Sequence, residues 1–341
     1  MSEVPTVSVV IATYNYGRFL AGAIDSVLSQ TFQDFEIIIV DDGSTDGTGD
    51  VVQAYLGDPR IQYVVTEHLG QPRAKNAAIR RARGKYVAFL DADDLWLPAK
   101  LQGQLAVFAR GGDNLAVVYC PAHWMDELGR RLKKVGRPPL RGDVLGPLFY
   151  RPFICFSTSM VRRDVLEDVG LFDESLPLAI DYDLWLKIGL RYHFDYADEP
   201  LAAYRTGHMN LSRRLPERTA CVSRIIRRFL DELGGRQRLD PALVRLVLAE
   251  HYLDTGNNLA EPSRLRSTAW FLKSMRTCPT YWPAWKQSVL IWLPRPLVAC
   301  LRRLLGRPDW RIIEQETKPP EERRVEPSIS IIADQTRIQK S

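Results

Sequence analysis

Short apolar runs alternate with longer amphipathic stretches over the first hundred residues. The short runs are rich in β-branched residues and predict strands at 7–12, 36–40, 61–65 and 86–90. Between the first two runs, apolar residues recur every three or four positions across 19–28, which predicts a crossover helix. This alternation is typical of βαβ units, so we expect an α/β fold with a parallel sheet.

The middle of the chain continues the mixed pattern. It predicts a helix at 98–110, a strand at 115–119, a hairpin or loop at 125–137, and another strand at 154–161. The first of these carries Pro98 in its first turn, where proline is tolerated.

Past residue 214 the pattern becomes helical. An apolar stripe marks a helix across 222–233, Asp240 and Pro241 form a good helix start, and 249–285 is typical of a helix pair. The tail after residue 319 is polar and predicts disorder. We therefore expect an α/β domain at 1–214, an α-helical region at 215–318 and a disordered tail at 319–341.

The composition excludes several classes of protein. Of 341 residues, 45% are hydrophobic and 26% charged, which excludes a wholly disordered, collagen-like or polytopic membrane chain. The net charge of +5 suits anionic ligands and gives no indication of nucleic acid binding. The five cysteines form no CxxC pair, and no uninterrupted apolar span of about 18 residues is present. Since residues 1–6 carry no basic residue and the apolar run 7–12 is short, we expect no export signal. We expect a cytoplasmic protein with reduced thiols.

Three carboxylates, Asp91, Asp93 and Asp94, directly follow an apolar strand. Carboxylates so placed can chelate a hard divalent cation such as Mg²⁺ or Mn²⁺, which in turn can bridge to a diphosphate. The alternative is a turn cap, because Asp is common at strand ends and helix starts.

A second acidic cluster spans 41–47 and follows another apolar run. It superficially matches a calcium-binding loop, but Gln53 stands where that loop needs a bidentate Glu, and a strand precedes it in place of a helix. A carboxylate at this strand end, such as Asp42, can instead accept hydrogen bonds from a nucleobase edge or a ribose hydroxyl.

Five sequence blocks, in order and spacing, resemble glycosyltransferase family 2. They are VSVVIATYN at 7–15, SVLSQTFQDF at 26–35, IVDDGSTD at 39–46, GKYVAFLDADD at 84–94 and GLFDE at 170–174. The resemblance runs from about residue 5 to residue 214. It implies a GT-A fold with a mostly parallel, mixed sheet, and transfer of a sugar with inversion from a nucleotide donor, by family habit a UDP-sugar, to a hydroxyl. The implied acceptor is a glycan or lipid-linked glycan of cell-envelope polysaccharide, lipopolysaccharide or glycolipid synthesis.

The resemblance also assigns donor-binding residues. Ala12 and Tyr14 would flank the base, and Asp42 would hydrogen-bond it. Lys75 stands where relatives often carry Arg, so it retains the charge and lacks the bidentate fork.

Asp91 and Asp93 match the family's DXD motif. By resemblance, Asp91 faces the ribose and the metal, and Asp93 ligates Mn²⁺ or Mg²⁺ through the diphosphate. Arg205 or His208, in the segment 204–208, is a candidate diphosphate contact, and a surface-loop histidine is the alternative for His208.

The segment 178–188 (LAIDYDLWLKI) resembles the family's acidic motif before a Trp-bearing helix. Asp181 falls in the position of the catalytic base, and Ile180 stands where an acidic residue is usual. Asp183 is the rival, and since it lies two residues further along a helix it must point to a different side. The alignment favours Asp181, and both residues could also act as ordinary helix-start carboxylates.

The stretch 282–307 mixes Trp, Leu and Val with Lys and Arg and contains no acidic residue. Such a mixture suits a helix lying peripherally on an anionic membrane surface, whereas the alternative is a helix pair packed on the catalytic domain. No oligomeric state is indicated.

A second function class is a binding or scaffolding protein that kept the GT-A fold and lost catalysis, as Ile180 and the extra residue before His208 suggest. A sugar-nucleotide pyrophosphorylase would need a glycine-rich basic loop after the first strand, and a Rossmann dehydrogenase would need GxGxxG there. The sequence has Thr13 to Gly17 (TYNYG) at that place.

Overall fold

The computed structural model describes residues 4–133, 139–207, 215–259 and 263–294. Contacts group the chain into two compact units, Met1–Ser288 and Val289–Ser341. The first unit contains both sheets and the helices that cover them.

The main sheet has seven strands in the order β10-β6-β9-β4-β1-β2-β3. Their bounds are β1 Val7–Thr13, β2 Phe35–Asp41, β3 Ile61–Val65, β4 Tyr86–Asp91, β6 Leu115–Tyr119, β9 Met160–Arg162 and β10 His193–Tyr196. The strands β3, β2, β1 and β4 pair in parallel, as do β6 and β10, while β9 runs antiparallel between β4 and β6. The predicted mostly parallel, mixed α/β sheet is confirmed.

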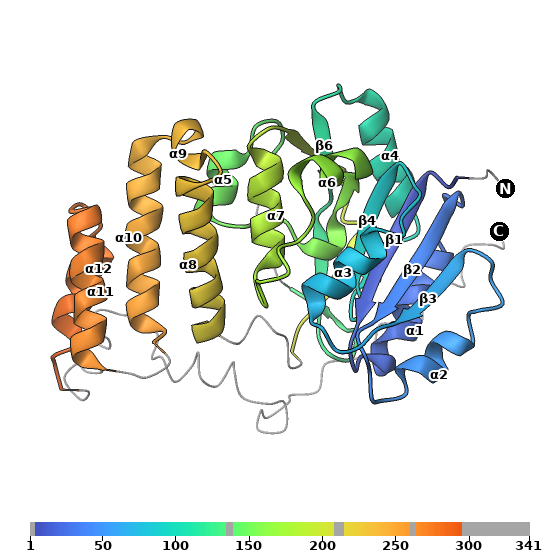
Figure 1. Ribbon diagram of the computed structural model, residues 1–341, viewed down its shortest axis with the longest axis horizontal. Coiled ribbons are helices and arrows are strands. Elements are labelled where there is room, and N and C mark those ends of the chain that lie inside the picture. Colours follow the sequence, from blue (N-terminus) through green and yellow to red (C-terminus); the bar gives the residue numbers. More distant parts are fainter. Residues whose placement is uncertain (1–3, 134–138, 208–214, 260–262, 295–341) are drawn as a thin grey trace, which may run out of the picture. The chain divides into compact units, whose positions relative to one another are not determined.

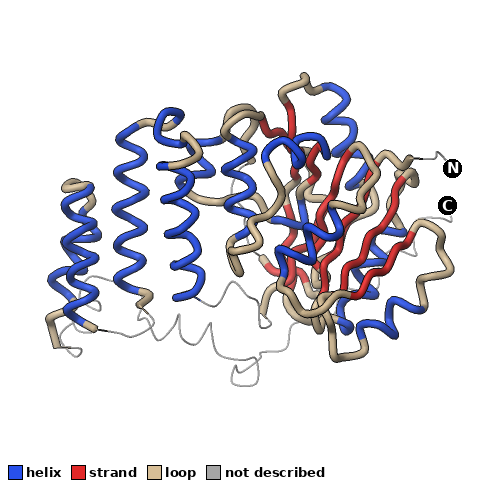
Figure 2. Tube along the Cα trace, in the orientation of Figure 1, coloured by secondary structure: helices blue, strands red, loops and turns tan. Residues whose placement is uncertain are grey.

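Helices cover both faces of this sheet (Figures 1 and 2). Along β1, Val9 and Ile11 belong to one buried cluster and Val10 to the other, because successive side chains point to opposite faces. The first cluster includes α1 Gly17–Leu28, α2 Thr48–Gln53 and α4 Lys100–Arg110. The second includes α3 Gln71–Ile79, α5 Leu145–Tyr150, α6 Arg163–Val169 and α7 Ile180–Gly189.

A smaller sheet has the order β5-β11-β7-β8, with bounds β5 Leu95–Trp96, β11 Ala202–Arg205, β7 Ala122–Met125 and β8 Arg131–Leu132. The sequence predicts a hairpin or loop at 125–137, and β7 and β8 form a hairpin there; residues 134–137 of that prediction lie outside the described residues. Since β11 pairs with β5, the end of β11 lies beside the segment that follows β4.

The predicted strand at 154–161 is wrong over its first half, which forms a short 3₁₀ helix, η1 Phe156–Thr158, before β9. The Thr158 hydroxyl donates to the Cys155 carbonyl at 2.6 Å, and the Ser159 hydroxyl donates to the Phe156 carbonyl at 2.7 Å. Such local side-chain bonds to the backbone compete with a strand ladder, and apolar periodicity does not report them.

The C-terminal helices are α8 Leu215–Asp231, α9 Gly235–Arg238, α10 Pro241–Asn257, α11 Arg264–Thr277 and α12 Trp282–Leu290. As predicted, Asp240 caps α10 by accepting the Ala242 N–H at 2.6 Å. α10 and α11 form the expected helix pair, in which the Ser274 hydroxyl donates to the Ala249 carbonyl.

The apolar face of α8 joins the same core cluster as α5 and α7, and the Phe229 ring lies 5.4 Å from the Phe149 ring. The division of the chain at residue 214 stays a prediction, and the tail 319–341 lies outside the described residues.

One buried carboxamide joins α3 to the Gly170–Glu174 block. Asn76 accepts the Phe172 N–H at 3.0 Å and donates to the Phe172 carbonyl and to Glu174, each at 2.9 Å. Asn76 is fully buried, so these bonds satisfy polar groups that water cannot reach. The contact fixes the segment that leads from β9 to α7 against the helix that carries Lys75.

Candidate active site

The carboxyl ends of β1, β2 and β4 finish level with one another. In the parallel register, Ala12 pairs with Asp91 and Thr13 pairs with Asp41. Loops that leave parallel strands at this edge are where open α/β sheets bind ligands. The predicted residues Ala12, Tyr14, Asp42, Asp91 and Asp93 therefore gather at one edge of the sheet.

The loop after β1 is bonded to the loop after β2. Asn15, whose φ is 57°, accepts the Thr45 N–H through its side chain at 2.7 Å, and its own N–H donates to the Ser44 hydroxyl at 2.9 Å. Asparagine tolerates this left-handed conformation better than most residues. The arrangement presents Tyr14, which stacks on His68 with ring centroids 3.9 Å apart and planes 21° apart.

Asp42 is buried and organises the loop before α3. Its two carboxylate oxygens accept the N–H groups of Leu69 at 2.8 Å and Gly70 at 2.9 Å, and His68 Nδ1 lies 3.0 Å from one of them. Asp42 thus has a structural role that sequence reasoning missed. Its contact to a base stays a prediction, which the remaining acceptor capacity of the carboxylate permits.

Lys75 and Asp91 form an ion pair at 2.9 Å, in which the lysine side chain is only 3% exposed. The ammonium also lies 3.5 Å from the centre of the Phe156 ring. Burial raises the pKa of Asp91, the Lys75 charge opposes this rise, and the carboxylates of Asp93 and Asp181 add to it. The lysine is therefore the cation that favours the ionised form of Asp91.

We call Asp91, Asp93 and Asp94 the carboxylate rim. Asp94 is its buried anchor: it accepts the Arg205 N–H at 2.8 Å and the Ser157 hydroxyl, and Ser157 in turn accepts the Asp91 N–H. Burial raises the pKa of Asp94 well above its usual range, and the charges of Asp93 and Asp91 add to the rise. Three acids at one strand end thus crowd one another electrostatically.

Arg205 braces the rim from the small sheet. Its Nε donates to the Asp93 carbonyl at 2.7 Å, and its Nη1 donates to the Glu127 carbonyl at 2.9 Å. The guanidinium also lies over the Phe19 ring at 4.7 Å. The diphosphate contact of Arg205 stays a prediction, and His208 lies outside the described residues.

Two further residues at the rim escaped sequence reasoning. Ser157 belongs to no recognised motif, and the signal that could have found it is the run Ser157–Ser159 inside an apolar segment. Tyr16 follows Tyr14 in the first loop, where burial and the charges of Asp93 and Asp91 raise its pKa to about 12. Its phenol therefore stays a neutral hydrogen-bond donor beside the rim.

The donor set of the rim suits a hard cation. Asp91 and Asp93 offer carboxylate oxygens, which Mg²⁺ and Mn²⁺ prefer. Within the described ranges, no group of three or more His, Cys, Asp or Glu side chains is arranged to hold a metal ion. The two carboxylates fit a cation that takes its other ligands from a bound molecule and from water.

Asp181 and Asp183 point in different directions, as predicted. Asp181 lies in the first turn of α7 and acts electrostatically on Asp91, so it belongs to the neighbourhood of the rim. Asp183 is 2% exposed and pairs with Arg228 and Lys187. Ile180, which stands where an acid was expected, is buried in the apolar core.

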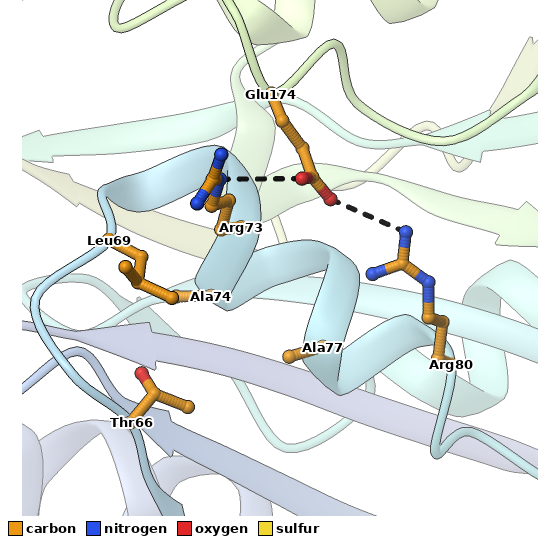
Figure 3. Close-up of a pocket in the computed structure, with 7 residues that line it drawn as sticks. All are labelled: Thr66, Leu69, Arg73, Ala74, Ala77, Arg80 and Glu174. Atoms are coloured by element: carbon orange, nitrogen blue, oxygen red, sulfur yellow. Dashed lines mark hydrogen bonds and ion pairs between the residues drawn. The ribbon is translucent and has the colours of Figure 1, made fainter.

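A pocket of about 270 Å³ lies on the face of α3 opposite Lys75 (Figure 3). It is lined by Thr66, Leu69, Arg73, Ala74, Ala77, Arg80 and Glu174. Figure 3 shows Arg73 and Arg80 directed toward Glu174, to which they are ion-paired at 3.4 and 3.3 Å. Two residues along a helix turn the side chain by about 200°, so Lys75 and the rim face away from this pocket.

Comparisons with known proteins agree on one family. The model described as "Glycosyl transferase family 2" matches residues 8–170. An uncharacterized glycosyltransferase of Nostoc sp. is 33% identical over 263 residues, which cover 69% of this chain and 78% of the relative. One from Rickettsia prowazekii is 36% identical over 189 residues, covering 54% of this chain and 58% of the relative, so the chain spans about three fifths of that protein.

Solved structures show the same architecture. TarS 1-349 from S. aureus in complex with UDP-GlcNAc has a TM-score of 0.57 at 18% identity, covering 83% of this chain and 92% of that one. The mannosyltransferase PcManGT from Pyrobaculum calidifontis in complex with GDP-Man and Mn²⁺ has a TM-score of 0.55 at 20% identity, with 86% and 82% covered.

Replacing Lys75 by Met tests the ion pair with Asp91. A carboxyl whose pKa is raised on folding makes the free energy of unfolding fall as pH rises from about 4 toward the raised value. Losing Lys75 raises the pKa of Asp91 further. We therefore expect Lys75→Met to lower the free energy of unfolding, relative to the wild type, by about 1–3 kcal/mol more at pH 8 than at pH 5. Urea unfolding with EDTA present measures this difference.

Arg73→Met is the matched control for that prediction, because Arg73 is half exposed and faces Glu174 on the opposite side of α3. Its cost should be small and equal at the two pH values. An equal deficit at pH 5 and pH 8 for Lys75→Met would contradict the assignment.

Proposed function

Since the chain belongs to glycosyltransferase family 2, we propose that it transfers a hexosyl group from a UDP-sugar to a hydroxyl acceptor with inversion at the sugar carbon. Its GT-A fold supplies the frame for this reaction. The observation that carries the proposal is the approach of two acidic groups from opposite elements, the rim after β4 and Asp181 on α7. The carboxylate rim would hold the metal ion that binds the departing diphosphate, and Asp181 would take the proton of the incoming alcohol.

Donor binding is proposed for the loops after β1 and β2. Ala12 and Tyr14 flank the base, Asp42 accepts a hydrogen bond from its edge, and Asp91 faces the ribose. Lys75 favours the ionised form of Asp91 and adds positive charge near the proposed diphosphate position. The proposal draws on TarS, whose structure contains UDP-GlcNAc, and on the pairing of Ala12 with Asp91 at the end of the sheet.

Asp91 and Asp93 are the residues that would hold Mn²⁺ or Mg²⁺. Such an ion stabilises the charge that grows on the leaving nucleoside diphosphate. Support comes from their oxygen donors and from PcManGT, whose structure contains Mn²⁺ with GDP-Man.

Asp181 is proposed as the general base. An acceptor alcohol is a weak nucleophile until its proton is removed, and a positioned carboxylate contributes about 10²- to 10⁴-fold to the rate. Inversion requires attack from the face opposite the diphosphate, so the base must come from an element other than β4. The carboxylate of Asp181 accepts the proton from the attacking oxygen, while Asp183 is engaged with α8.

The biological acceptor proposed is a glycan or lipid-linked glycan of cell-envelope polysaccharide, lipopolysaccharide or glycolipid synthesis. The second candidate function is a GT-A-fold binding or scaffolding protein, which the buried Ile180 at the usual acidic position favours. The two candidates differ in whether the wild-type chain turns over a sugar nucleotide, and Asp181 is the residue proposed to carry that turnover.

Nucleotide preference is tested by thermal shift with UDP, thymidine diphosphate or GDP, each with Mn²⁺. We expect UDP with Mn²⁺ to raise the melting temperature most, because a ligand at 100-fold its Kd stabilises by about 2.7 kcal/mol. Asp93→Asn should remove the Mn²⁺-dependent part of the shift. If none of the three nucleotides stabilises the chain, the donor assignment fails.

Asp181→Asn tests the base in a donor-turnover assay. We expect kcat to fall about 10²- to 10⁴-fold with the donor KM nearly unchanged, since the donor residues lie on other elements. Asp50→Asn, at an exposed position of α2, is the control and should retain full turnover. Unchanged kcat in Asp181→Asn would remove Asp181 from the mechanism, whereas absence of turnover in the wild type would favour the binding-protein alternative.

We further propose that 282–307 contacts the membrane surface peripherally from the cytoplasmic side. Of the helices in described residues, none is both long and apolar enough to cross a membrane. Trp282 and Trp285 on α12 are 70% and 43% exposed, and no acidic residue occurs between Glu261 and Asp309. Exposed tryptophans among basic residues suit an anionic lipid interface. Residues 295–307 lie outside the described residues.

Vesicle sedimentation tests this contact. The chain should bind vesicles with about one third anionic phosphatidylglycerol and should bind pure phosphatidylcholine weakly. The double variant Trp282→Ala/Trp285→Ala should partition about tenfold less. Leu128→Ala, which removes a 76% exposed apolar side chain elsewhere, should bind like the wild type. If the tryptophan variant binds anionic vesicles as strongly as the wild type, the proposal is wrong.

A further inference from the structure

A buried ion network lies behind α7, on the side away from the carboxylate rim. Asp183 is 2% exposed, and its carboxylate pairs with Arg228 Nη2 at 2.5 Å and with Lys187 Nζ at 3.3 Å. Charges this deeply buried are tolerated only when they are paired. Asp183 is therefore committed to holding α7 in place.

Arg228 also reaches a second carboxylate. Its Nη1 binds Asp173, which belongs to the Gly170–Glu174 block, while Lys187 Nζ donates to the Leu171 carbonyl at 2.6 Å. One guanidinium from α8 thus joins α7 to the segment that precedes it. A planar fork that bonds two carboxylates at once has a geometry that lysine cannot reproduce.

The start of α7 needs this support. Ala179 has a φ of 57° in the left-handed region, which costs a residue with a side chain about 1 kcal/mol or more, and the helix has no side-chain cap. Asp181 lies in this first turn. Asp183, two residues on, turns by about 200° and faces α8 while Asp181 faces the rim.

We infer that Arg228 is a positioning residue for Asp181: it clamps Asp183 and Asp173 and so fixes the first turn of α7 against the carboxylate rim. The inference rests on the proposed role of Asp181 as base. Arg228 lies on α8, beyond the residues 8–170 that the family model matches, so this inference gives the helical region a part in positioning the base.

The clamp should affect turnover more than donor affinity. A general base must lie within hydrogen-bond reach of the proton it takes, and a misplacement of about 1 Å can cost about 100-fold in rate. Donor binding depends on the loops after β1, β2 and β4, which Arg228 does not contact in the described structure.

The first test compares Arg228→Met, Arg228→Lys and Arg227→Met. Arg227 is exposed on the same helix, so its variant removes an equal charge without touching the clamp. The assay measures hydrolysis of UDP-glucose, UDP-galactose and UDP-N-acetylglucosamine with Mn²⁺. Arg228→Met should lower kcat about 10- to 100-fold with KM within about threefold, Arg228→Lys should recover part of the loss, and Arg227→Met should match the wild type.

If Arg228→Met does not fold, the double variant Arg228→Met/Asp183→Asn replaces it, because it removes the buried carboxylate along with its partner. It should fold and still show the kcat loss. Wild-type kcat in either variant, or a loss carried by KM, would overturn the inference.

Hydrogen exchange provides a test that does not need turnover. In Arg228→Met, the amides of residues 180–184 should exchange at least about tenfold faster, while those of β1 and β4 keep wild-type rates. If the amides of residues 180–184 exchange at wild-type rates in Arg228→Met, the inference that Arg228 fixes this turn is wrong. If the wild type hydrolyses none of the three donors, the proposed function fails for these substrates, and the exchange result alone decides the inference.

Discussion

The site depends on compensating the three carboxylates of the rim, which lie together at the end of β4. Asp91, Asp93 and Asp94 fall within positions 91–94 at the end of β4, so their charges cannot move far apart. Lys75 compensates Asp91, Ser157 and the Arg205 amide satisfy Asp94, and Asp93 remains partly exposed. A site built this way favours a bound cation, because a positive charge relieves the repulsion that makes each carboxylate harder to ionise.

Much of the fold could be predicted because hydrophobic periodicity reports burial directly. Three of the four early strands extend one residue or so beyond their predicted ends, and the fourth, β3, matches its prediction. The error at 154–161 arose because hydroxyl side chains bonded the local backbone, and no pattern of apolar positions records that choice. Residues 208–214, which include His208, lie outside the described structure.

The site was predictable where motifs named residues and was missed where the structure supplied partners. The motifs named Ala12, Asp91 and Asp93; the register pairs Ala12 with Asp91 at the strand ends, and the roles of all three stay predictions. They could not identify the anchors, since Ser157 and Arg228 each act through a contact between segments distant in sequence. Asp42 illustrates the same limit, because its backbone partners Leu69 and Gly70 carry no side-chain signal.

The packing of α8 bears on where the folding unit ends. A chain shortened to residue 214 would retain all five family blocks, yet it would leave the Asp183 carboxylate without Arg228 and the Phe149 ring without Phe229. The shortest chain that carries the sugar-nucleotide motifs would then be shorter than the shortest chain that folds on its own. Exchanging catalytic modules between relatives at residue 214 would separate α7 from Arg228, which neutralises the Asp183 carboxylate on that helix.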